Sequence, residues 1–313
     1  MKSWDAPLPV LDGVAPSRVF LPRGPWRTLL EFLAVRFPYV GADILRHRLE
    51  TGQIVDDAGV AQVAGDAYRP QRWLWYYREV PDEAPVPFEV RVLYRDSRLV
   101  VIDKPHFLPS VPSGRYLRET ALVRLRRDLQ LPALSPLHRL DRETAGVMLF
   151  CVDPACRGAY QSLFQARRVR KVYEAVAPVR AGLVLPLTRR SRLRARAGAF
   201  TVDEVEGEAN SETRVQLLMH RAGAPGLYRL LPATGHKHQL RAHMSALGIP
   251  ILNDTLYPEV RRQPMEDYER PLQLLAREIR FLDPFDGTVR CFRSERWLAA
   301  DPTRREDGDC FRA

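Results

Sequence analysis

Residues 138–150, HRLDRETAGVMLF, place one carboxylate, Asp141, between two arginines, Arg139 and Arg142. An aspartate beside arginines is most often a surface ion pair or a turn residue. In this segment, however, a Thr-Ala-Gly sequence leads directly into the apolar run 147–151, which is typical of a buried strand. We therefore expect Asp141 to lie at the mouth of a cleft, where its charge serves chemistry rather than solubility.

A second stretch, residues 232–258 (PATGHKHQLRAHMSALGIPILNDTLYP), contains a cation that could hold such a carboxylate ionised. A Thr-Gly pair predicts a turn, and residues 236–247 have helical spacing. On that helix His238, Arg241 and Ser245 share one face, since residues three or four apart are neighbours. A guanidinium aimed from this face at a buried carboxylate would keep the acid ionised and fix its rotamer.

The net charge narrows the class of partner. The 313 residues include 48 lysines and arginines against 38 aspartates and glutamates, which gives a net charge of +10 and a sequence pI of about 9.7. Such a surface favours a polyanion such as nucleic acid or an anionic membrane.

No apolar run approaches the roughly 20 residues of a membrane span. The N-terminus lacks the plan of a signal peptide, and the cysteines lack disulfide or zinc spacing, so we expect a cytoplasmic protein.

Three histidines, His236, His238 and His243, raise the question of a metal site. Their spacing matches no strong metal-binding motif, and no acidic cluster lies beside them. Polar contacts to RNA or hydrogen bonds in the core explain them better. We therefore expect no metal.

The segment 170–178, RKVYEAVAP, has the alternation of a strand. It places Lys171, Tyr173 and Ala175 on one face. A tyrosine in a strand is usually a core residue, but in a protein that binds RNA it can also be a platform on which an unstacked base lies.

The elements that must position these residues follow from periodicity. Leucine spacing over residues 26–57 predicts a small helical module, and the proline- and acid-rich stretch 79–89 reads as an extended linker. Helices are further expected at 119–129 and 154–166, and strands at 53–56, 91–96, 99–105, 171–179, 213–219, 227–232 and 274–282. Many strands with few helices predict the α+β class, with a mixed, mainly antiparallel sheet. The segment 188–196, TRRSRLRAR, stands out only as rich in arginine.

Four stretches, in their order and spacing, resemble the motifs of the RluA-type pseudouridine synthases. They are VIDKPHFLPSVPSG (101–114), HRLDRETAGVMLF (138–150), RKVYEAV (170–176) and TGHKHQLRAHMSALGIPILNDTLY (234–257), and the match covers roughly residues 85–285. The N-terminal module resembles the S4-like RNA-binding domain that precedes the catalytic domain in many of these enzymes. The expected domains are therefore an S4-like module (1–80), a linker (81–90), a catalytic domain (91–300) and a tail (301–313).

The resemblance implies isomerisation of specific uridines to pseudouridine in structured ribosomal or transfer RNA, with neither metal nor organic cofactor. Nothing in the sequence demands a partner chain, so a monomer is favoured. The resemblance implies that Asp141 is the nucleophile, which attacks either the ribose anomeric carbon or the uracil ring. It also implies that Tyr173 stacks on the target uracil and that Arg241 pairs with Asp141. The other residues it implies for substrate binding are Arg139, Leu140, Lys171, His238 and Leu240. Flipping the target nucleotide out of a folded RNA costs a few kcal/mol of free energy, which arginine contacts to phosphates could offset.

Some positions depart from the family pattern. Phe107 stands where glycine is common, His236 where arginine is common, and Ala145 where serine is common. We expect the change at His236 to affect the choice of substrate more than the activity. Two other functions compete with the enzyme: a non-catalytic RNA-binding or ribosome-assembly protein on the same fold, and a metal-dependent nuclease. A binding protein would not need Asp141, Tyr173 and Arg241 together, and a nuclease would need clustered carboxylates.

Overall fold

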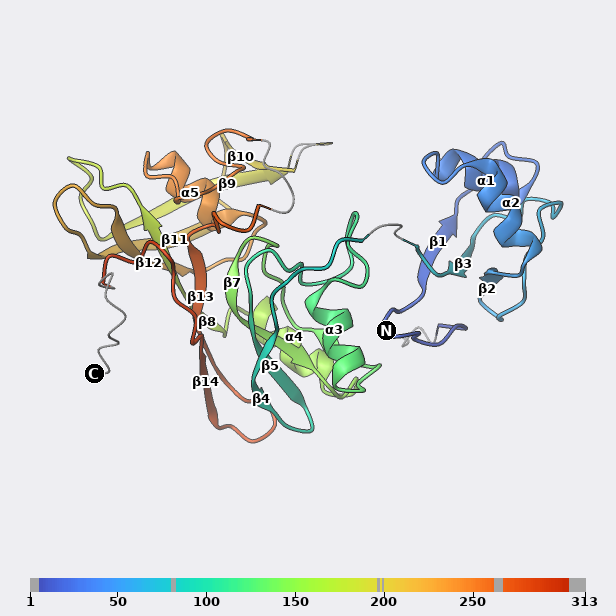
Figure 1. Ribbon diagram of the computed structural model, residues 1–313, viewed down its shortest axis with the longest axis horizontal. Helices are drawn as coiled ribbons and strands as arrows, with labels where there is room; N and C mark the ends of the chain where they lie inside the picture. Colours follow the sequence, from blue (N-terminus) through green and yellow to red (C-terminus); the bar gives the residue numbers. More distant parts are fainter. Residues whose placement is uncertain (1–5, 80–82, 196–197, 199, 262–266, 304–313) are drawn as a thin grey trace. The chain divides into compact units, whose positions relative to one another are not determined.

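The structure, a computed structural model, describes residues 6–79, 83–195, 198, 200–261 and 267–303 (Figure 1). Most of the expected tail (301–313), the start of the expected linker (81–90) and Cys310 lie outside these residues. The chain divides into two compact units. The smaller comprises Met1–Ala84, 113–118 and 123–132, and the larger comprises the remaining residues. Two segments from the range 91–300 therefore belong to the smaller unit.

The N-terminal part of the smaller unit, residues 6–79, combines two helices with a three-stranded antiparallel sheet of order β1-β3-β2. Its elements are β1 (Ser17–Leu21), α1 (Leu29–Arg36), α2 (Ala42–Glu50), β2 (Ile54–Asp56) and β3 (Arg72–Tyr76). Leu29, Leu33, Leu45 and Leu49 are buried in its core, so the leucine spacing predicted both helices. The module is nevertheless not purely helical, because β1 and β3 pair across about 50 residues of sequence and helical periodicity carries no sign of that pairing.

The larger unit is built on an eleven-stranded sheet of order β10-β9-β11-β12-β8-β13-β7-β5-β4, with β14 on β13 and β6 on β7. Its strands are β4 (Arg91–Arg95), β5 (Leu99–Lys104), β6 (Ser135–Pro136), β7 (Ala145–Cys151), β8 (Arg170–Ala177), β9 (Leu187–Ala195), β10 (Val202–Val205), β11 (Ser211–Met219), β12 (Gly226–Pro232), β13 (Leu274–Leu282) and β14 (Val289–Arg293). Among the described strands the pairing is antiparallel except between β13 and β7. The predicted α+β class with a mainly antiparallel sheet is confirmed.

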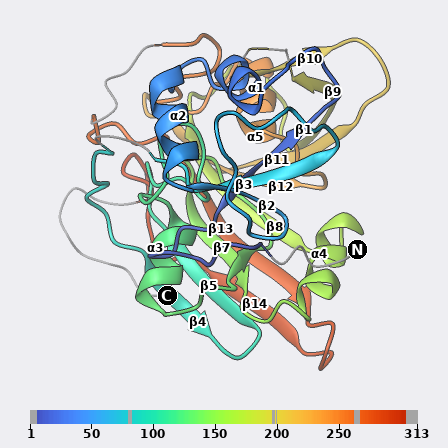
Figure 2. The same cartoon turned by 90° about the vertical axis from the view of Figure 1, so that its right-hand side faces the viewer.

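Two hydrophobic cores pack on different parts of this sheet. The helices α4 (Arg157–Gln165) and α5 (Gln239–Ala246) contribute to them (Figures 1 and 2). Most of α3 (Ala121–Asp128) belongs to the smaller unit. Tyr160 and Leu163 of α4 pack with residues of β5, β7 and β13. Leu240 and Met244 of α5 pack with residues of β8, β11 and β12. No helix within the described ranges is long and apolar enough to cross a membrane.

The segment 188–196 is more than a compositional bias, because residues up to Ala195 belong to strand β9. The inward side chains of this strand include Arg189 and Ser191, which bond to Glu204 and His243. Polar residues on the inner face remove the usual alternation of apolar and polar residues. The strand could therefore not be recognised from hydrophobic periodicity.

Gly146 explains the Thr-Ala-Gly sequence at the start of β7. Its φ is +112°, and a Cβ atom there would lie 2.3 Å from the carbonyl oxygen of Ala276. This close approach accompanies the short parallel contact of β7 with β13, in which Gly146 is the partner of Ala276. Only glycine fits both the dihedral angle and the contact. The residue therefore fixes where the loop that carries Asp141 enters the sheet.

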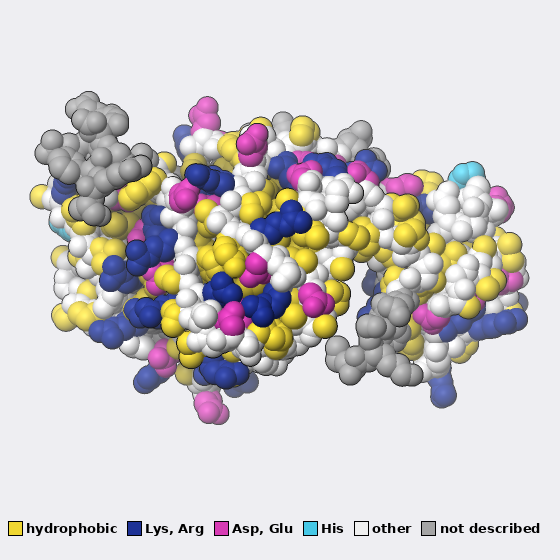
Figure 3. All heavy atoms as spheres, turned by 90° about the horizontal axis from the view of Figure 1, so that it is seen from below, with side chains coloured by type: hydrophobic (Ala, Val, Ile, Leu, Met, Phe, Trp, Pro, Cys, Tyr) yellow, Lys and Arg dark blue, Asp and Glu magenta, His cyan; other side chains and the backbone are white. Residues whose placement is uncertain are grey.

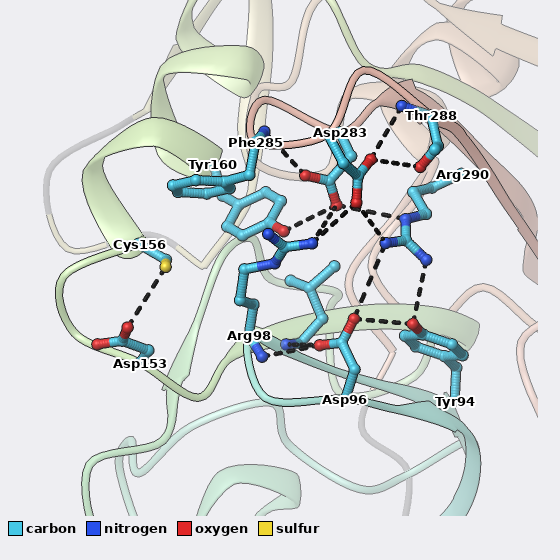
Figure 4. A network of polar contacts seen from close by, with 12 residues as sticks. Tyr94, Asp96, Arg98, Asp153, Cys156, Tyr160, Asp283, Phe285, Thr288 and Arg290 are labelled. Carbon is cyan, nitrogen blue, oxygen red and sulfur yellow. Dashed lines mark hydrogen bonds and ion pairs between the residues drawn. The ribbon is translucent and has the colours of Figure 1, made fainter.

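A network of polar side chains connects a turn, a helix and a hairpin of the larger unit (Figure 4). The fully buried carboxylate of Asp283 accepts hydrogen bonds from the hydroxyl of Tyr160 (2.9 Å) and from Nε of Arg290 (3.3 Å). Arg290 also donates to the hydroxyl of Tyr94 (3.1 Å), which in turn donates to Asp96 (2.7 Å). These contacts join the β4–β5 turn, α4 and the β13–β14 hairpin. They stabilise the scaffold, and none of these residues lines the pocket described next.

Candidate active site

One pocket in the larger unit collects every residue that the sequence marked for a role. Its lining includes all eight: Arg139, Leu140, Asp141, Lys171, Tyr173, His238, Leu240 and Arg241. They come from the loop before β7, from β8, and from the start of α5. The space between the lining atoms is about 470 Å³, which includes open solvent at the mouth of the pocket.

The backbone around Asp141 is held by the segment that follows β5. The hydroxyl of Ser110 donates to the carbonyl of Leu140 (2.6 Å) and accepts from the N–H of the same residue (3.1 Å). The ammonium of Lys104 donates to the carbonyl of Arg142 (3.2 Å), and a ring nitrogen of His106 contacts the carbonyl of Glu143 at 2.6 Å. We call Lys104, His106 and Ser110 the clamp. It fixes the loop without using the carboxylate of Asp141.

Lys104 can serve in the clamp because its surroundings are rich in carbonyl groups. The side chain is fully buried and also donates to the carbonyls of Pro105 (2.8 Å) and Leu108 (2.7 Å). Burial lowers the pKa of Lys104 to about 7, although the carboxylates of Glu143 and Asp141 act in the opposite direction. The ammonium donates to all three carbonyls from a single nitrogen, which the wider planar fork of an arginine could not do, so the sequence motif DKP supplies a lysine here.

Phe107 lies within the same segment and has a φ of +65°. This left-handed conformation favours glycine, which is the residue common at this position in the family that the motifs resemble. The phenylalanine ring is buried against Tyr268, with ring centroids 5.3 Å apart, and against the guanidinium of Arg142 at 5.6 Å. Burial of the ring offsets the backbone strain, so the departure at Phe107 leaves the clamp in place.

The main partner of Arg241 is not Asp141 but Asp254. Nε and Nη2 of Arg241 donate to the two carboxylate oxygens of Asp254 at 2.8 and 2.6 Å, and both side chains are only 1% exposed. The third nitrogen, Nη1, lies 3.6 Å from Oδ2 of Asp141 and 3.6 Å from Oε2 of Glu143. The expected pairing with Asp141 is therefore a longer ion pair, and Nη1 has no hydrogen bond to any described residue.

This arrangement keeps the guanidinium charged and in place. Burial would lower the pKa of Arg241, but the hydrogen bonds and charge of Asp254, together with Asp141 and Glu143, raise it above its ordinary value. Because Asp254 takes two of the three nitrogens, Arg241 supplies positive charge to Asp141 without binding its oxygens tightly. The carboxylate of Asp141, whose side chain is 27% exposed, remains accessible to a ligand.

Tyr173 lies in the middle of β8, next to Leu230 of β12 and Ala276 of β13. Its side chain is partly buried in the wall of the pocket. Burial raises the pKa of Tyr173, and the negative charge of Asp141 raises it further. The phenol therefore stays protonated at neutral pH, and its flat ring face is the part suited to contact a base.

His238 reaches the site by a route that the helical pattern did not predict. The helix begins at Gln239, and His238 precedes it with a left-handed φ of +53°. The side chain of Gln239 accepts from the N–H of His236 (3.1 Å) and from Thr234 (2.7 Å), which stabilises a turn in place of a first helical turn. His238 and Arg241 therefore do not share a helix face.

Nε2 of His238 nevertheless lies 3.9 Å from Oδ1 of Asp141, and Nδ1 lies 3.3 Å from the hydroxyl of Tyr257. Burial lowers the pKa of His238, and the charge of Asp141 opposes that shift.

The two other cations of the pocket differ in how they are held. Lys171 donates to the carbonyl of Thr234 (3.2 Å). Arg139 is exposed and has no ion pair with any residue in the described ranges, so its guanidinium is available to a ligand.

The three histidines have separate partners in the protein. His243 is fully buried and bonds to Ser191, Ser211 and Thr213, while His236 contacts the carbonyl of Asn210 at 2.9 Å. Burial lowers the pKa of His243 to about 4, so its imidazole is neutral. Within the part of the chain that the structure describes, no group of three or more His, Cys, Asp or Glu residues could hold a metal ion.

Comparison with known proteins places this site in a family. A family model for RNA pseudouridylate synthase matches residues 98–246. The dual-specificity RNA pseudouridine synthase RluA of Yersinia pestis is 31% identical over 209 residues, which cover 65% of this chain and 98% of that protein. The chain belongs to the RNA pseudouridylate synthase family. The predicted RluA-type resemblance and the assignment as an RNA pseudouridine synthase are thereby confirmed.

Two human proteins are also similar to this chain. Pseudouridylate synthase RPUSD2 of Homo sapiens is 34% identical over 188 residues, which are 58% of this chain, and the chain spans 33% of that protein's length. The solved structure of human RNA pseudouridylate synthase domain containing 1 superposes with a TM-score of 0.54 at 26% identity, covering 68% of this chain and 85% of the other. The fold of the larger unit is therefore that of the family.

Reasoning from sequence missed several residues of this pseudouridine synthase site. They are Asp254 beside Arg241, Tyr257 beside His238, and Thr144 and Gln239 in the wall. Asp254 had one signal, since it is the single acid in the fourth motif. Its pairing with Arg241, 13 residues earlier, depends on a turn after α5 that spacing does not reveal.

Proposed function

We propose that this chain isomerises specific uridines in structured ribosomal or transfer RNA and that Asp141 is the nucleophile. The observation that carries the proposal is the placement of an accessible carboxylate 3.6 Å from a buried, permanently charged guanidinium, in a pocket walled by Tyr173. Arg241 favours the ionised, nucleophilic form of Asp141. All eight residues expected at the site line a single pocket of this chain, and we further propose that it acts as a monomer in the cytoplasm.

The reaction divides into two covalent steps. A carboxylate oxygen of Asp141 attacks either the anomeric carbon, so that its bond to N1 breaks and the base leaves with the electron pair, or the uracil ring, whose carbonyl takes up the charge before the bond between N1 and the anomeric carbon breaks. After the base turns over, its C5 forms the bond to the anomeric carbon and the bond to Asp141 breaks. The proton lost from C5 balances the one gained at N1, so the product is an isomer.

The remaining residues of the pocket would bind and orient the nucleotide. The ring of Tyr173 would stack on the uracil, since a phenol that stays protonated is a poor base. The exposed guanidinium of Arg139 would contact the RNA that surrounds the flipped nucleotide. We also propose that the smaller unit is an S4-like RNA-binding module, which its exposed arginines Arg23, Arg46 and Arg69 support.

Mapping pseudouridine across total RNA tests the proposed function. Carbodiimide adducts that resist alkali mark pseudouridine in RNA from a deletion strain and its parent. We expect one or a few adducts to be missing in the deletion strain and to return when the wild-type chain is supplied. Identical maps in the two strains would contradict the assignment to these RNAs.

Substitutions of Tyr173 separate stacking from proton transfer. We expect Tyr173→Phe to retain most of the activity, because the ring face is unchanged, and Tyr173→Leu to lose about 1–3 kcal/mol of transition-state stabilisation, the range found for stacking of a base on an aromatic ring. Single-turnover rates on a substrate RNA measure both. Equal losses in the two variants would instead assign the role to the hydroxyl group.

A further inference from the structure

The face of the sheet opposite the pocket carries a row of five exposed arginines. They are Arg190, Arg192 and Arg194 on β9, Arg214 on β11 and Arg229 on β12, which we call the arginine stripe. Strand alternation places their neighbours Ser191, Thr213 and Leu230 on the other face, which packs against α5. Figure 1 shows the three strands as adjacent parts of one half of the sheet.

Strand register gives the stripe its spacing. Arg190 is paired with Glu212, so Arg214 lies one strand over and two residues along, and Arg229 is paired with Gln216 on the next strand, again two residues along. With about 3.3 Å per residue and 4.8 Å between strands, neighbouring members lie roughly 7–8 Å apart and the stripe is roughly 28 Å long. The row follows β9 through its three arginines and then runs diagonally across β11 and β12.

The charge of the stripe is only partly neutralised. Arg190 pairs with Glu212 at 2.7 Å, whereas Arg192, Arg194, Arg214 and Arg229 have no ion pair with another described residue. Asp203 and Glu174 lie opposite Arg194 and Arg229 on the same face, but Glu174 is bound by Arg277 at 2.6 Å. Cations therefore exceed carboxylates along the row. Figure 3 shows lysines and arginines gathered in several groups on the face of the molecule that is seen from below.

We infer that the arginine stripe is a second RNA-binding surface, which holds the phosphate backbone of a segment distant from the target uridine. The inference rests on the proposed function only in that RNA is the polyanion. Planar guanidinium groups suit phosphate contacts, and a regular row matches a repeating backbone rather than one bound ion. Strand β10 is the edge of the sheet beside β9, so an RNA that enters the pocket could pass over this edge to the opposite face.

The test compares two RNAs and two triple variants of the full chain. The probes are a short hairpin and the same hairpin with its stem lengthened by two helical turns. The stripe variant carries Arg192→Gln, Arg194→Gln and Arg214→Gln. The control variant carries Arg168→Gln, Arg170→Gln and Arg280→Gln, which removes the same charge from exposed arginines outside the stripe. Dissociation constants are measured over a range of salt concentrations.

For the long hairpin we expect the stripe variant to bind at least about tenfold more weakly than wild type. The slope of log affinity against log salt concentration should also be smaller in magnitude by about two to three, which is about one for each lost phosphate contact. For the short hairpin its affinity stays within about twofold, and the control variant changes little with either RNA. Equal losses in both variants, or equal losses with both hairpins, would overturn the inference. Because binding is measured directly, this result does not depend on whether Asp141 is the nucleophile, which product formation tests separately.

Discussion

Asp141→Asn is expected to abolish pseudouridine formation, lowering the rate by at least about four orders of magnitude as loss of a nucleophile does in other covalent enzymes. The amide keeps the shape of the side chain but has no charge with which to form the ester. The clamp bonds only to the backbone of this loop, so the loop should keep its position. RNA affinity should stay within about tenfold. Product per enzyme and the dissociation constant, measured on the same RNA, check both expectations.

Glu143→Gln is the matched control for that substitution. Its carboxylate is also 3.6 Å from Nη1 of Arg241 and equally exposed, but Glu143 does not line the pocket. The variant changes the charge around Arg241 in the same way and should retain product formation. If Asp141→Asn forms product at an undiminished rate, the assignment fails. If both variants are equally inactive, the site requires negative charge near Arg241 rather than a nucleophile at position 141.

Asp254→Asn should damage both stability and catalysis. Removing one charge from a buried, bidentate pair leaves the guanidinium of Arg241 without its partner, which costs about 3–5 kcal/mol of unfolding free energy. Arg241 would then turn its nitrogens to the nearest carboxylates, those of Asp141 and Glu143. A tightly bonded Asp141 is a poorer nucleophile, so we expect kcat per folded molecule to fall at least about tenfold with a smaller change in KM.

Asp103→Asn controls for the loss of a buried carboxylate as such. The side chain of Asp103 is 1% exposed and accepts hydrogen bonds from Ser294 (2.7 Å) and from the N–H of Glu295 (2.8 Å), and none of these residues lines the pocket. It should lower the midpoint of denaturant unfolding but leave kcat per folded molecule unchanged. A normal kcat in folded Asp254→Asn would show that the pair with Arg241 stabilises the fold without positioning the site.

Two kinds of information were readable from the chain alone. The order and spacing of four motifs identified the family, and with it the eight residues that line one pocket. Strands such as β13 and the helices α1 and α2 followed from hydrophobic periodicity, because that signal is local. Strand β9 was not predicted from this periodicity, because its inner face includes the polar residues Arg189 and Ser191. Their hydrogen-bond partners, Glu204 and His243, lie on other elements.

Pairings between distant residues came from the folded chain. Arg241 has the carboxylates of Asp141, Glu143 and Asp254 within reach, and which of them takes the short bonds depends on the turn after α5. The left-handed conformation of His238 and the three carbonyls around Lys104 likewise arise from packing. Periodicity reports neighbours along a helix or strand, whereas a bidentate contact requires atoms from different segments to meet within a few tenths of an ångström. For that reason the members of the site could be named in advance, but not the way in which they hold one another.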